Sequence, residues 1–358
     1  MGDYPSGSVN ANAGGSEVTG RHSRAAGTGV SPIPPDDQTP LGGGGSILPR
    51  KAAFSMESGF RGLSTAAAAM VLVIILAIAI FLISKAAPAL TADKASFLTS
   101  KEWFPNDASP RFGIAALAFG TVLSSIIALI VAVPIALGIA LFLSHYAPRR
   151  LATPLGFVID LLAAVPSVVF GLWGRDVFQS PVRDFSVWLN HYFGWLPLFG
   201  GDGPFGKSIM LGSLVLAIMV LPIVTSLSRE VFQQTPTANE EAALALGATK
   251  WEMVRTSVLP YGQPGVIASV MLGLGRALGE TIALAMTLGI VFNVSFNLIE
   301  NGGNSIAANI ANTFGEANNT GRGALIASGL VLFAITLVVN MAARAIIYRR
   351  REFRDSAA

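Results

Sequence analysis

The amino-acid sequence predicts an all-α integral membrane protein whose chain crosses the lipid bilayer six times. Of its 358 residues, 52% are hydrophobic and only 13% are charged, whereas an ordinary soluble domain carries about 25% charged residues. Long apolar stretches alternate with short polar ones along the chain. These stretches lack the strict alternation of apolar and polar residues that is typical of a membrane β-barrel, so the spans are predicted to be helices.

The two ends of the chain differ from the middle in composition. Gly, Ser, Pro, Asn and Asp are frequent at the start. Such a segment buries too little apolar surface to offset the entropy lost on ordering, so residues 1–60 are predicted to be a disordered tail. Residues 61–84 are predicted to be the first transmembrane helix, because the run from Leu63 to Ile83 has about the 20 apolar residues that a crossing requires. Residues 349–358 form a basic tail.

Residues 112–348 are predicted to form the core domain with the other five spans. These spans are expected at 113–143, 155–173, 208–227, 263–289 and 323–347. Pro134 and Pro166 lie inside two of them, and a proline within a span frees a carbonyl group that neighbouring helices must satisfy. The aromatic and charged residues of 174–207 predict a short interfacial helix. The Asn- and Gly-rich outer stretch before the last span carries a small amphipathic patch at Ile306, Ile310 and Phe314.

The distribution of positive charge predicts the orientation of the spans. Six crossings place both termini on the same side of the membrane. The segments on that side hold 15 of the Lys and Arg residues, and the segments on the other side hold 8. Because positive charge is enriched in cytoplasmic loops, both tails and the segment 229–262 are predicted to be cytoplasmic.

Several function classes are excluded or disfavoured by composition. The chain has no cysteine, and its three histidines, His22, His145 and His191, lie far apart without ligand spacing, which argues against a metal site. No nucleophile–base set is evident, no cofactor is predicted, and the net charge of +3 is too small to imply nucleic-acid binding. Residues 201–208 match the P-loop expression GxxxxGK[ST], but an aromatic interfacial stretch precedes them instead of a strand, so nucleotide binding there is rejected.

The predicted cytoplasmic segment before the fifth span has the pattern of two short helices. Thr237-x-x-Glu240 and Thr249-x-x-Glu252 are capping-box patterns, and Gly247 is placed to end the first helix. The exposed faces carry more apolar surface than a solvated loop needs, which indicates a docking site; the residues concerned are Leu246, Trp251 and Met253. An ordinary cytoplasmic helical loop is the alternative.

Within this segment, Glu241-Ala-Ala, Gly247 and Leu259-Pro260 together resemble the EAA loop of permease subunits in type I ABC importers. The resemblance implies a MetI-like core whose coupling helix docks into a cytoplasmic ATPase. Ser257 stands where the family usually has Ile, a minor departure. The residues implied at the ATPase contact are Glu240, Glu241, Ala242, Ala243, Gly247, Trp251, Leu259 and Pro260.

Four further stretches are similar to signatures of phosphate-specific ABC permeases of the PstC type: 162–171, 221–230, 273–281 and 309–317. The resemblance covers about residues 60–350. It implies a bacterial cytoplasmic-membrane subunit that pairs with a PstA-type permease, two PstB-type ATPases and an external PstS-type phosphate-binding protein. The chain itself would then be no enzyme, since the ATPases would hydrolyse ATP while the permease moves phosphate inward by alternating access.

Two opposite charges stand inside the apolar fifth span, Arg276 and Glu280. An unpaired charge at the bilayer centre costs at least roughly 2.5–3.5 kcal/mol, so both are expected to face a subunit interface, one helical turn apart on the same face. A guanidinium group can bind two oxygens of a phosphate ion at once. An ion pair between Arg276 and Glu280 would lower the affinity of Arg276 for phosphate, so that phosphate passes through. The predicted substrate pathway is Arg276, Glu280 and Thr281; a structural ion pair is the alternative.

Other transport functions stay open at this point. Another oxyanion, such as sulfate or molybdate, would suit the same arginine. A proton- or sodium-coupled secondary transporter would use Arg276 and Glu280 as a relay, but it predicts inverted repeats, which the sequence does not show. A membrane scaffold or phosphate sensor is compatible with transport.

Overall fold

The structure is a computed structural model that describes residues 56–355, with side chains for residues 59–345. The chain divides into two units, Met1–Gly62 and Leu63–Ala358. Of the first unit, the described residues are the beginning of helix α1. Most of the predicted disordered tail, residues 1–55, therefore lies outside the described residues, as do the side chains of the basic C-terminal tail.

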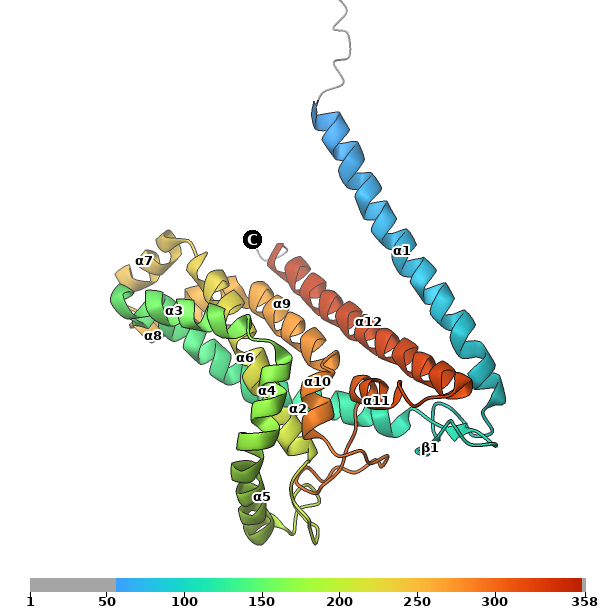
Figure 1. Cartoon of the computed structure of the whole chain (residues 1–358). Helices are drawn as coiled ribbons and strands as arrows, with labels where there is room; N and C mark the ends of the chain where they lie inside the picture. Colours follow the sequence, from blue (N-terminus) through green and yellow to red (C-terminus); the bar gives the residue numbers. More distant parts are fainter. Residues whose placement is uncertain (1–55, 356–358) are drawn as a thin grey trace, which may run out of the picture. The chain divides into compact units, whose positions relative to one another are not determined.

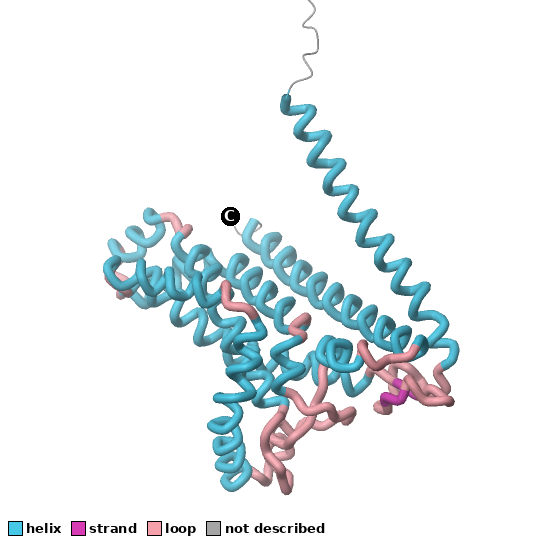
Figure 2. Tube along the Cα trace, in the orientation of Figure 1, coloured by secondary structure: helices cyan, strands magenta, loops and turns pink. Residues whose placement is uncertain are grey.

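Helices make up most of the described chain (Figures 1 and 2). Two short strands, β1 (Trp103–Phe104) and β2 (Arg111–Phe112), pair antiparallel in the loop after α1. Three turns, labelled η, have π-helical geometry. In chain order the helical elements of the described residues are α1 (Met56–Ala92), α2 (Ala115–Leu141), η1 (Phe142–Tyr146), α3 (Arg149–Ala163), α4 (Ser167–Trp173), η2 (Gly174–Phe178), α5 (Gln179–Phe193), α6 (Ile209–Gln233), α7 (Thr237–Ala245), α8 (Lys250–Met253), η3 (Val254–Val258), α9 (Leu259–Leu278), α10 (Ile282–Thr287), α11 (Ile306–Thr313) and α12 (Asn319–Asp355).

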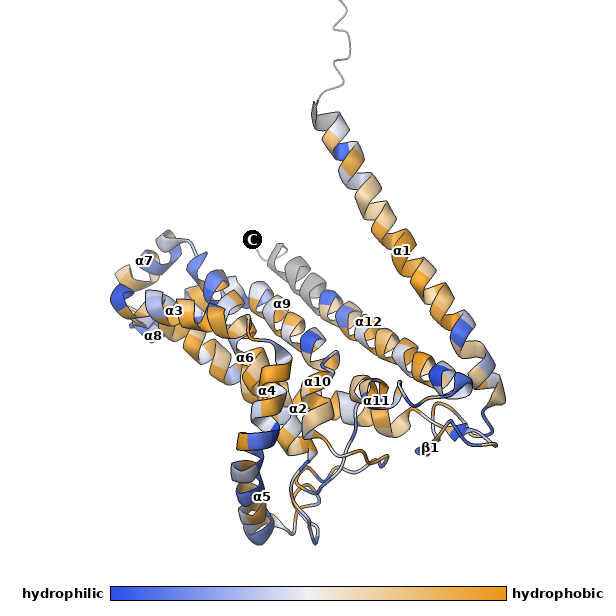
Figure 3. Cartoon of the chain, viewed as in Figure 1, coloured by the Kyte–Doolittle hydropathy of each residue, from blue (hydrophilic) through white to orange (hydrophobic). Residues whose placement is uncertain are grey.

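The first predicted span is longer in the structure than the sequence suggested. Helix α1 begins at Met56 and ends at Ala92, beyond the expected end at residue 84. Figure 3 shows apolar residues along most of its length, and they are exposed in the described chain, as expected for a surface that contacts lipid or another subunit. Its last turns pack inward, because Ala89 is buried against Gly323 at the start of α12.

The centre of the second unit is the packing of α2, α6 and α9, with α6 the most buried of the long helices. Four alanines spaced four residues apart form a buried stripe on α2; side chains of α6 join the first three in one core cluster, and the fourth lies in a smaller cluster with Phe232 of α6. Residues at this spacing share one helix face, and small side chains allow membrane helices to approach closely. The stripe consists of Ala128, Ala132, Ala136 and Ala140.

The third predicted span is bent far more sharply than a single crossing. Helix α3 and the helical stretch Ser167–Phe193 meet at 89°, and Pro166 caps α4 in an extended conformation. Proline disfavours helix in the residue before it and cannot donate the missing hydrogen bond. Counting this bent pair as one span gives the predicted six; by length and composition the described helices otherwise include five. The stretch 174–207, predicted to hold a short interfacial helix, contains helix α5, which is continuous with α4 through η2; its place at the membrane interface stays a prediction.

The fifth predicted span, residues 263–289, is two helices and not one. Helix α9 ends at Leu278, and α10 begins at Ile282 after a short break. Arg276 therefore lies in the last turn of α9. The expectation that it occupies the centre of a continuous helix was wrong, because an apolar composition cannot reveal a break.

The Asn- and Gly-rich stretch before α12, which the sequence predicts to lie on the outer side and which we call the outer stretch, is folded into the protein. Its predicted amphipathic patch is helix α11, in which Ile306 and Asn309 are fully buried. The N–H of Ile306 donates a hydrogen bond to Thr121 Oγ1 at 2.9 Å. At the neighbouring Gly120, an added Cβ atom would lie 2.0 Å from the carbonyl oxygen of Asn304, so this close approach to α2 requires glycine.

Candidate functional site

We name residues 237–258 the coupling insert after their resemblance to the EAA loop; they hold α7, α8 and η3 and run directly into α9 (Figure 1). Thr249 begins α8 with the predicted capping box: its hydroxyl accepts from the N–H of Glu252, and the Glu252 carboxylate accepts from the N–H of Thr249 at 2.8 Å. Gly247 follows α7 with φ +87°, the left-handed conformation that glycine supplies at a helix C-terminus. The predicted end of the first helix and start of the second are therefore both confirmed.

The other predicted capping box is wrong. Helix α7 is preceded by Pro236 at the N-cap, without a side-chain cap. The Glu240 carboxylate does not reach back to the helix start, because it contacts the imidazole of His145, with 3.3 Å between Glu240 Oε1 and His145 Nε2. His145 is 95 residues away in the chain, and no spacing in the sequence signals this contact.

The surface of the insert carries exposed apolar side chains. Leu246 is 90% exposed and Trp251 is 55% exposed, as the sequence analysis expected for a docking face. Met253 is different: it is buried in a small cluster with Ala140, Phe232, Val254 and Val258. That cluster attaches α8 and η3 to the ends of α2 and α6, so Met253 belongs to the core and its expected exposure was wrong.

Arg276 and Glu280, the two charged residues of the fifth predicted span, lie close in the sequence but form no ion pair in the part of the chain that the structure describes. The Glu280 side chain is 7% exposed, and its Oε1 accepts a hydrogen bond from the N–H of Ala283 at 3.1 Å, at the start of α10. The hydroxyl of Thr281 donates to the carbonyl of Gly279. Among the described residues no ion pair joins Arg276 to Glu280, and Arg276 Nε is buried without a hydrogen-bond partner. The expected resting-state ion pair is absent because Glu280 caps the next helix.

Arg276 lines a cavity of about 660 Å³ between α6, α9 and α12. Its polar lining residues are Arg276, Asn340 and Arg344, and apolar residues such as Ile223, Met271 and Leu272 complete it. Two arginines without a lining carboxylate form a site suited to an anion. Glu280 and Thr281 are not among the lining residues. Arg344 lies within the sixth predicted span, 323–347, and nothing in the sequence singled it out as a site residue.

A second charged contact fixes the bent third span. The Asp160 carboxylate of α3 accepts from the hydroxyl of Ser226 at 2.6 Å and pairs with Arg229 of α6 at 3.3 Å. Gly156 permits this arrangement, since an added Cβ would lie 1.7 Å from Arg229 Nη1. Arg229 lies in the stretch 221–230 that the sequence analysis singled out, whereas Asp160 carried no recognisable signal.

Residues 201–208, which match the P-loop expression, form a loop after helix α5. No strand precedes this loop, and Ser208 caps α6 by accepting from the N–H of Leu211. Its neighbour in space is the outer stretch 297–302, with which it forms isolated β-bridges. The loop therefore lacks the strand–loop–helix arrangement that a P-loop requires.

Comparison with known proteins identifies the family to which the chain is similar. Residues 132–352 match the family described as binding-protein-dependent transport system inner membrane component. The chain is 49% identical over 292 residues to "Phosphate transport system permease protein PstC 2" of Mycobacterium tuberculosis, covering 80% of this chain and 90% of the relative. It is 41% identical over 321 residues to "Phosphate transport system permease protein PstC" of Xylella fastidiosa, covering 88% and 96%.

Among solved structures, the inward-facing MetNI methionine ABC transporter has a chain 14% identical to this one. The match covers 64% of this chain and 92% of that chain, with a TM-score of 0.47. The predicted all-α membrane fold with a type I ABC importer core is confirmed by the family match and the apolar helices. The chain is a multi-pass membrane protein that belongs to the binding-protein-dependent transport system inner membrane components, with relatives of the PstC type.

Proposed function

We propose that this chain is the permease subunit of an ATP-driven importer of inorganic phosphate. The observation that carries the proposal is the cavity in which Arg276 and Arg344 present two guanidinium groups without a carboxylate. Phosphate is an anion near neutral pH, and a guanidinium fork binds its oxygens in two places. The names of the PstC relatives support phosphate as the anion.

In this proposal the chain performs no chemistry of its own. A PstB-type ATPase pair would dock against the exposed face of the coupling insert, where Glu241, Leu246 and Trp251 are exposed. A PstA-type permease would complete the pore, and a PstS-type binding protein would deliver phosphate on the outer side. Both tails and the insert would be cytoplasmic, as the distribution of Lys and Arg indicates.

Arg276 and Glu280 would act in different ways. Arg276 would contact the anion, because its guanidinium lines the cavity and Nε lacks a partner in the described chain. Glu280 would shape the pathway indirectly by holding the start of α10, and Thr281 would contribute to the same turn. An ion-coupled relay between Arg276 and Glu280 is disfavoured by the absence of contact between them. Sulfate or molybdate would fit the same two arginines and is the rival substrate class.

The test is uptake of radiolabelled phosphate into proteoliposomes that contain the whole complex. ATP is supplied on the ATPase side and the binding protein on the other. We expect ATP-dependent accumulation that excess sulfate or molybdate does not compete away, and a drop of at least tenfold for Arg276→Gln with assembly intact. Arg111→Gln is the matched control, because Arg111 forms an exposed ion pair with Glu102 and should transport normally. Uptake driven by an ion gradient without ATP would refute the proposal.

A further inference from the structure

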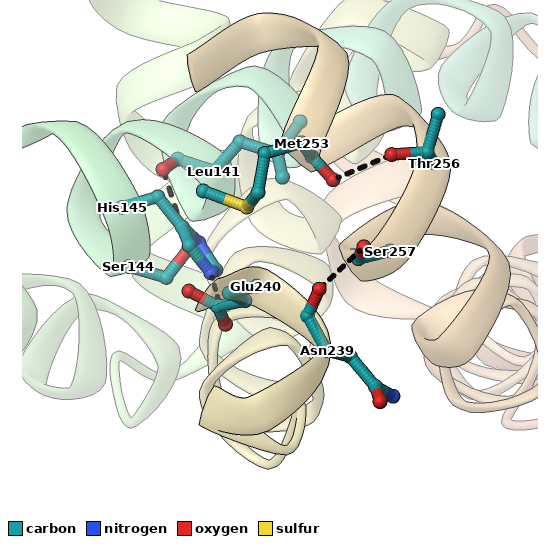
Figure 4. Close-up of polar contacts among 8 residues, drawn as sticks. All are labelled: Leu141, Ser144, His145, Asn239, Glu240, Met253, Thr256 and Ser257. Atoms are coloured by element: carbon teal, nitrogen blue, oxygen red, sulfur yellow. Dashed lines mark hydrogen bonds and ion pairs between the residues drawn. The ribbon is translucent and has the colours of Figure 1, made fainter. Parts of the chain in front are cut away.

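The coupling insert is attached to the end of α2 by a histidine. His145 lies in η1, the π-helical turn that continues α2, and its side chain is 9% exposed. Its Nε2 lies 3.3 Å from Glu240 Oε1 on α7. In Figure 4 the imidazole and the carboxylate face one another across the gap between the two helices. Among the described residues this is the hydrogen bond that joins α7 to η1.

Both ring nitrogens of His145 have a hydrogen-bond partner. Nδ1 lies 2.7 Å from Ser144 Oγ, whose hydroxyl also lies 3.2 Å from the carbonyl oxygen of Leu141, and Nε2 faces the Glu240 carboxylate. Because an ionised carboxylate accepts hydrogen bonds and cannot donate them, the tautomer with its proton on Nε2 donates to Glu240, and its Nδ1 accepts from the Ser144 hydroxyl. These two contacts fix the orientation of the ring between η1 and α7.

The two adjacent glutamates of the insert have different surroundings. Glu240 is partly buried and faces His145, whereas Glu241 is exposed. Neighbouring residues on an α-helix point about 100° apart, so one turn of α7 presents one carboxylate to the membrane-spanning helices and the other to solvent. Glu241 is the one available to a partner; Glu240, which the EAA resemblance placed at the ATPase contact, is engaged within the chain.

A second contact ties α7 to the following segment. The hydroxyl of Ser257 in η3 donates to the carbonyl oxygen of Asn239 at 3.2 Å (Figure 4). This contact links α7 forward to η3, which runs into α9, while His145–Glu240 links α7 back to η1 at the end of α2. Helix α7 is thus held between two of the three helices that form the centre of the fold.

We propose that His145 is a positioning residue that transmits movement of the coupling insert to α2. The inference rests on the proposed function: when the ATPases displace α7, the His145–Glu240 contact moves the end of α2 with it. The alanine stripe of α2 packs against α6, and α6 in turn lines the cavity that contains Arg276.

The test compares coupling in the whole complex in proteoliposomes. We expect His145→Ala to assemble with the ATPase and hydrolyse ATP, but to move about five- to tenfold less phosphate for each ATP. His145→Gln keeps an N–H donor and should recover most of the wild-type ratio. His191→Ala is the control, because His191 is an exposed histidine on α5. His145→Ala combined with Glu240→Ala should be no worse than either alone, since both remove the same contact.

A second readout does not depend on phosphate transport. The chain has no cysteine, so two introduced cysteines can be spin-labelled without labelling any other site in this subunit. The substitutions are Ala245→Cys on α7 and Ile130→Cys on α2. The distance distribution between them should stay narrow during ATP turnover and broaden in His145→Ala. A wild-type coupling ratio in His145→Ala, an unchanged label distribution, or equal loss of assembly in His145→Ala and His145→Gln would each overturn the proposal. A wild-type complex that fails to accumulate phosphate would refute the proposed function, and the label distances would still decide the link.

Discussion

Two glycines on α2 form a matched pair that tests how the outer stretch is held against the spanning helices. A methyl group at Gly120 would lie 2.0 Å from the carbonyl oxygen of Asn304, whereas nothing lies within 4 Å of one at Gly138. Real Cβ atoms stay at least 3.0 Å from such an oxygen, so Gly120→Ala must push two backbones apart by about 1 Å. That shift would also lengthen or break the hydrogen bond from the N–H of Ile306 to Thr121 Oγ1.

The size of the effect follows from these two contacts. Overpacking costs about 1–3 kcal/mol and a lost hydrogen bond about 1 kcal/mol, so Gly120→Ala should lower the free energy of unfolding by about 2–4 kcal/mol. Gly138→Ala removes only the backbone freedom of an exposed glycine within a helix and should stabilise by about 0.5–1 kcal/mol.

Thermal unfolding of the two purified variants in the same detergent checks this prediction. With about 2–4 °C for each kcal/mol, Gly120→Ala should lower Tm by roughly 4–16 °C, and Gly138→Ala should raise it slightly. Phosphate uptake at a temperature well below both transitions would show whether the outer stretch also matters for transport. A Tm of Gly120→Ala equal to or above that of Gly138→Ala would refute the packing argument.

Two further predictions concern the cavity and the insert. Arg344→Gln should reduce phosphate uptake by about tenfold while Arg344→Lys keeps much of it, because the site needs positive charge there; equal uptake in both variants and wild type would remove Arg344 from the pathway. Glu241→Lys should abolish co-purification with the ATPase without changing Tm, since the side chain is exposed and makes no contact that folding needs; normal co-purification would place the docking contact elsewhere in the insert.

Local signals in the sequence predicted local structure well. The run from Leu63 is a helix, Thr249 caps α8 as its spacing with Glu252 indicates, and Gly247 adopts the positive φ that its place after α7 requires. Each of these depends on residues within about four positions of one another, where propensity and capping chemistry act directly.

Contacts between residues that are distant in the chain could not be predicted from the sequence. His145 and Glu240 are 95 residues apart, and Arg229 and Asp160 are 69 apart; neither pair has a spacing that marks it. The break after Leu278 was missed for a different reason: the residues of the break are flanked by apolar stretches, so residues 263–289 as a whole still have the length and composition of one span. Arg344 lies in the sixth predicted span, and no local pattern signals that its helix brings it to the same cavity as Arg276.

The break between α9 and α10 changes the electrostatics of the span. A helix carries partial negative charge at its C-terminus and partial positive charge at its N-terminus. Arg276 stands in the last turn of α9, and Glu280 stands at the start of α10, so each side chain complements the dipole of its own half-helix. The membrane therefore tolerates both charges without a direct bond between them. Under the proposed function the guanidinium would keep its positive potential available to the anion, whereas an i, i+4 ion pair in a continuous helix would neutralise it.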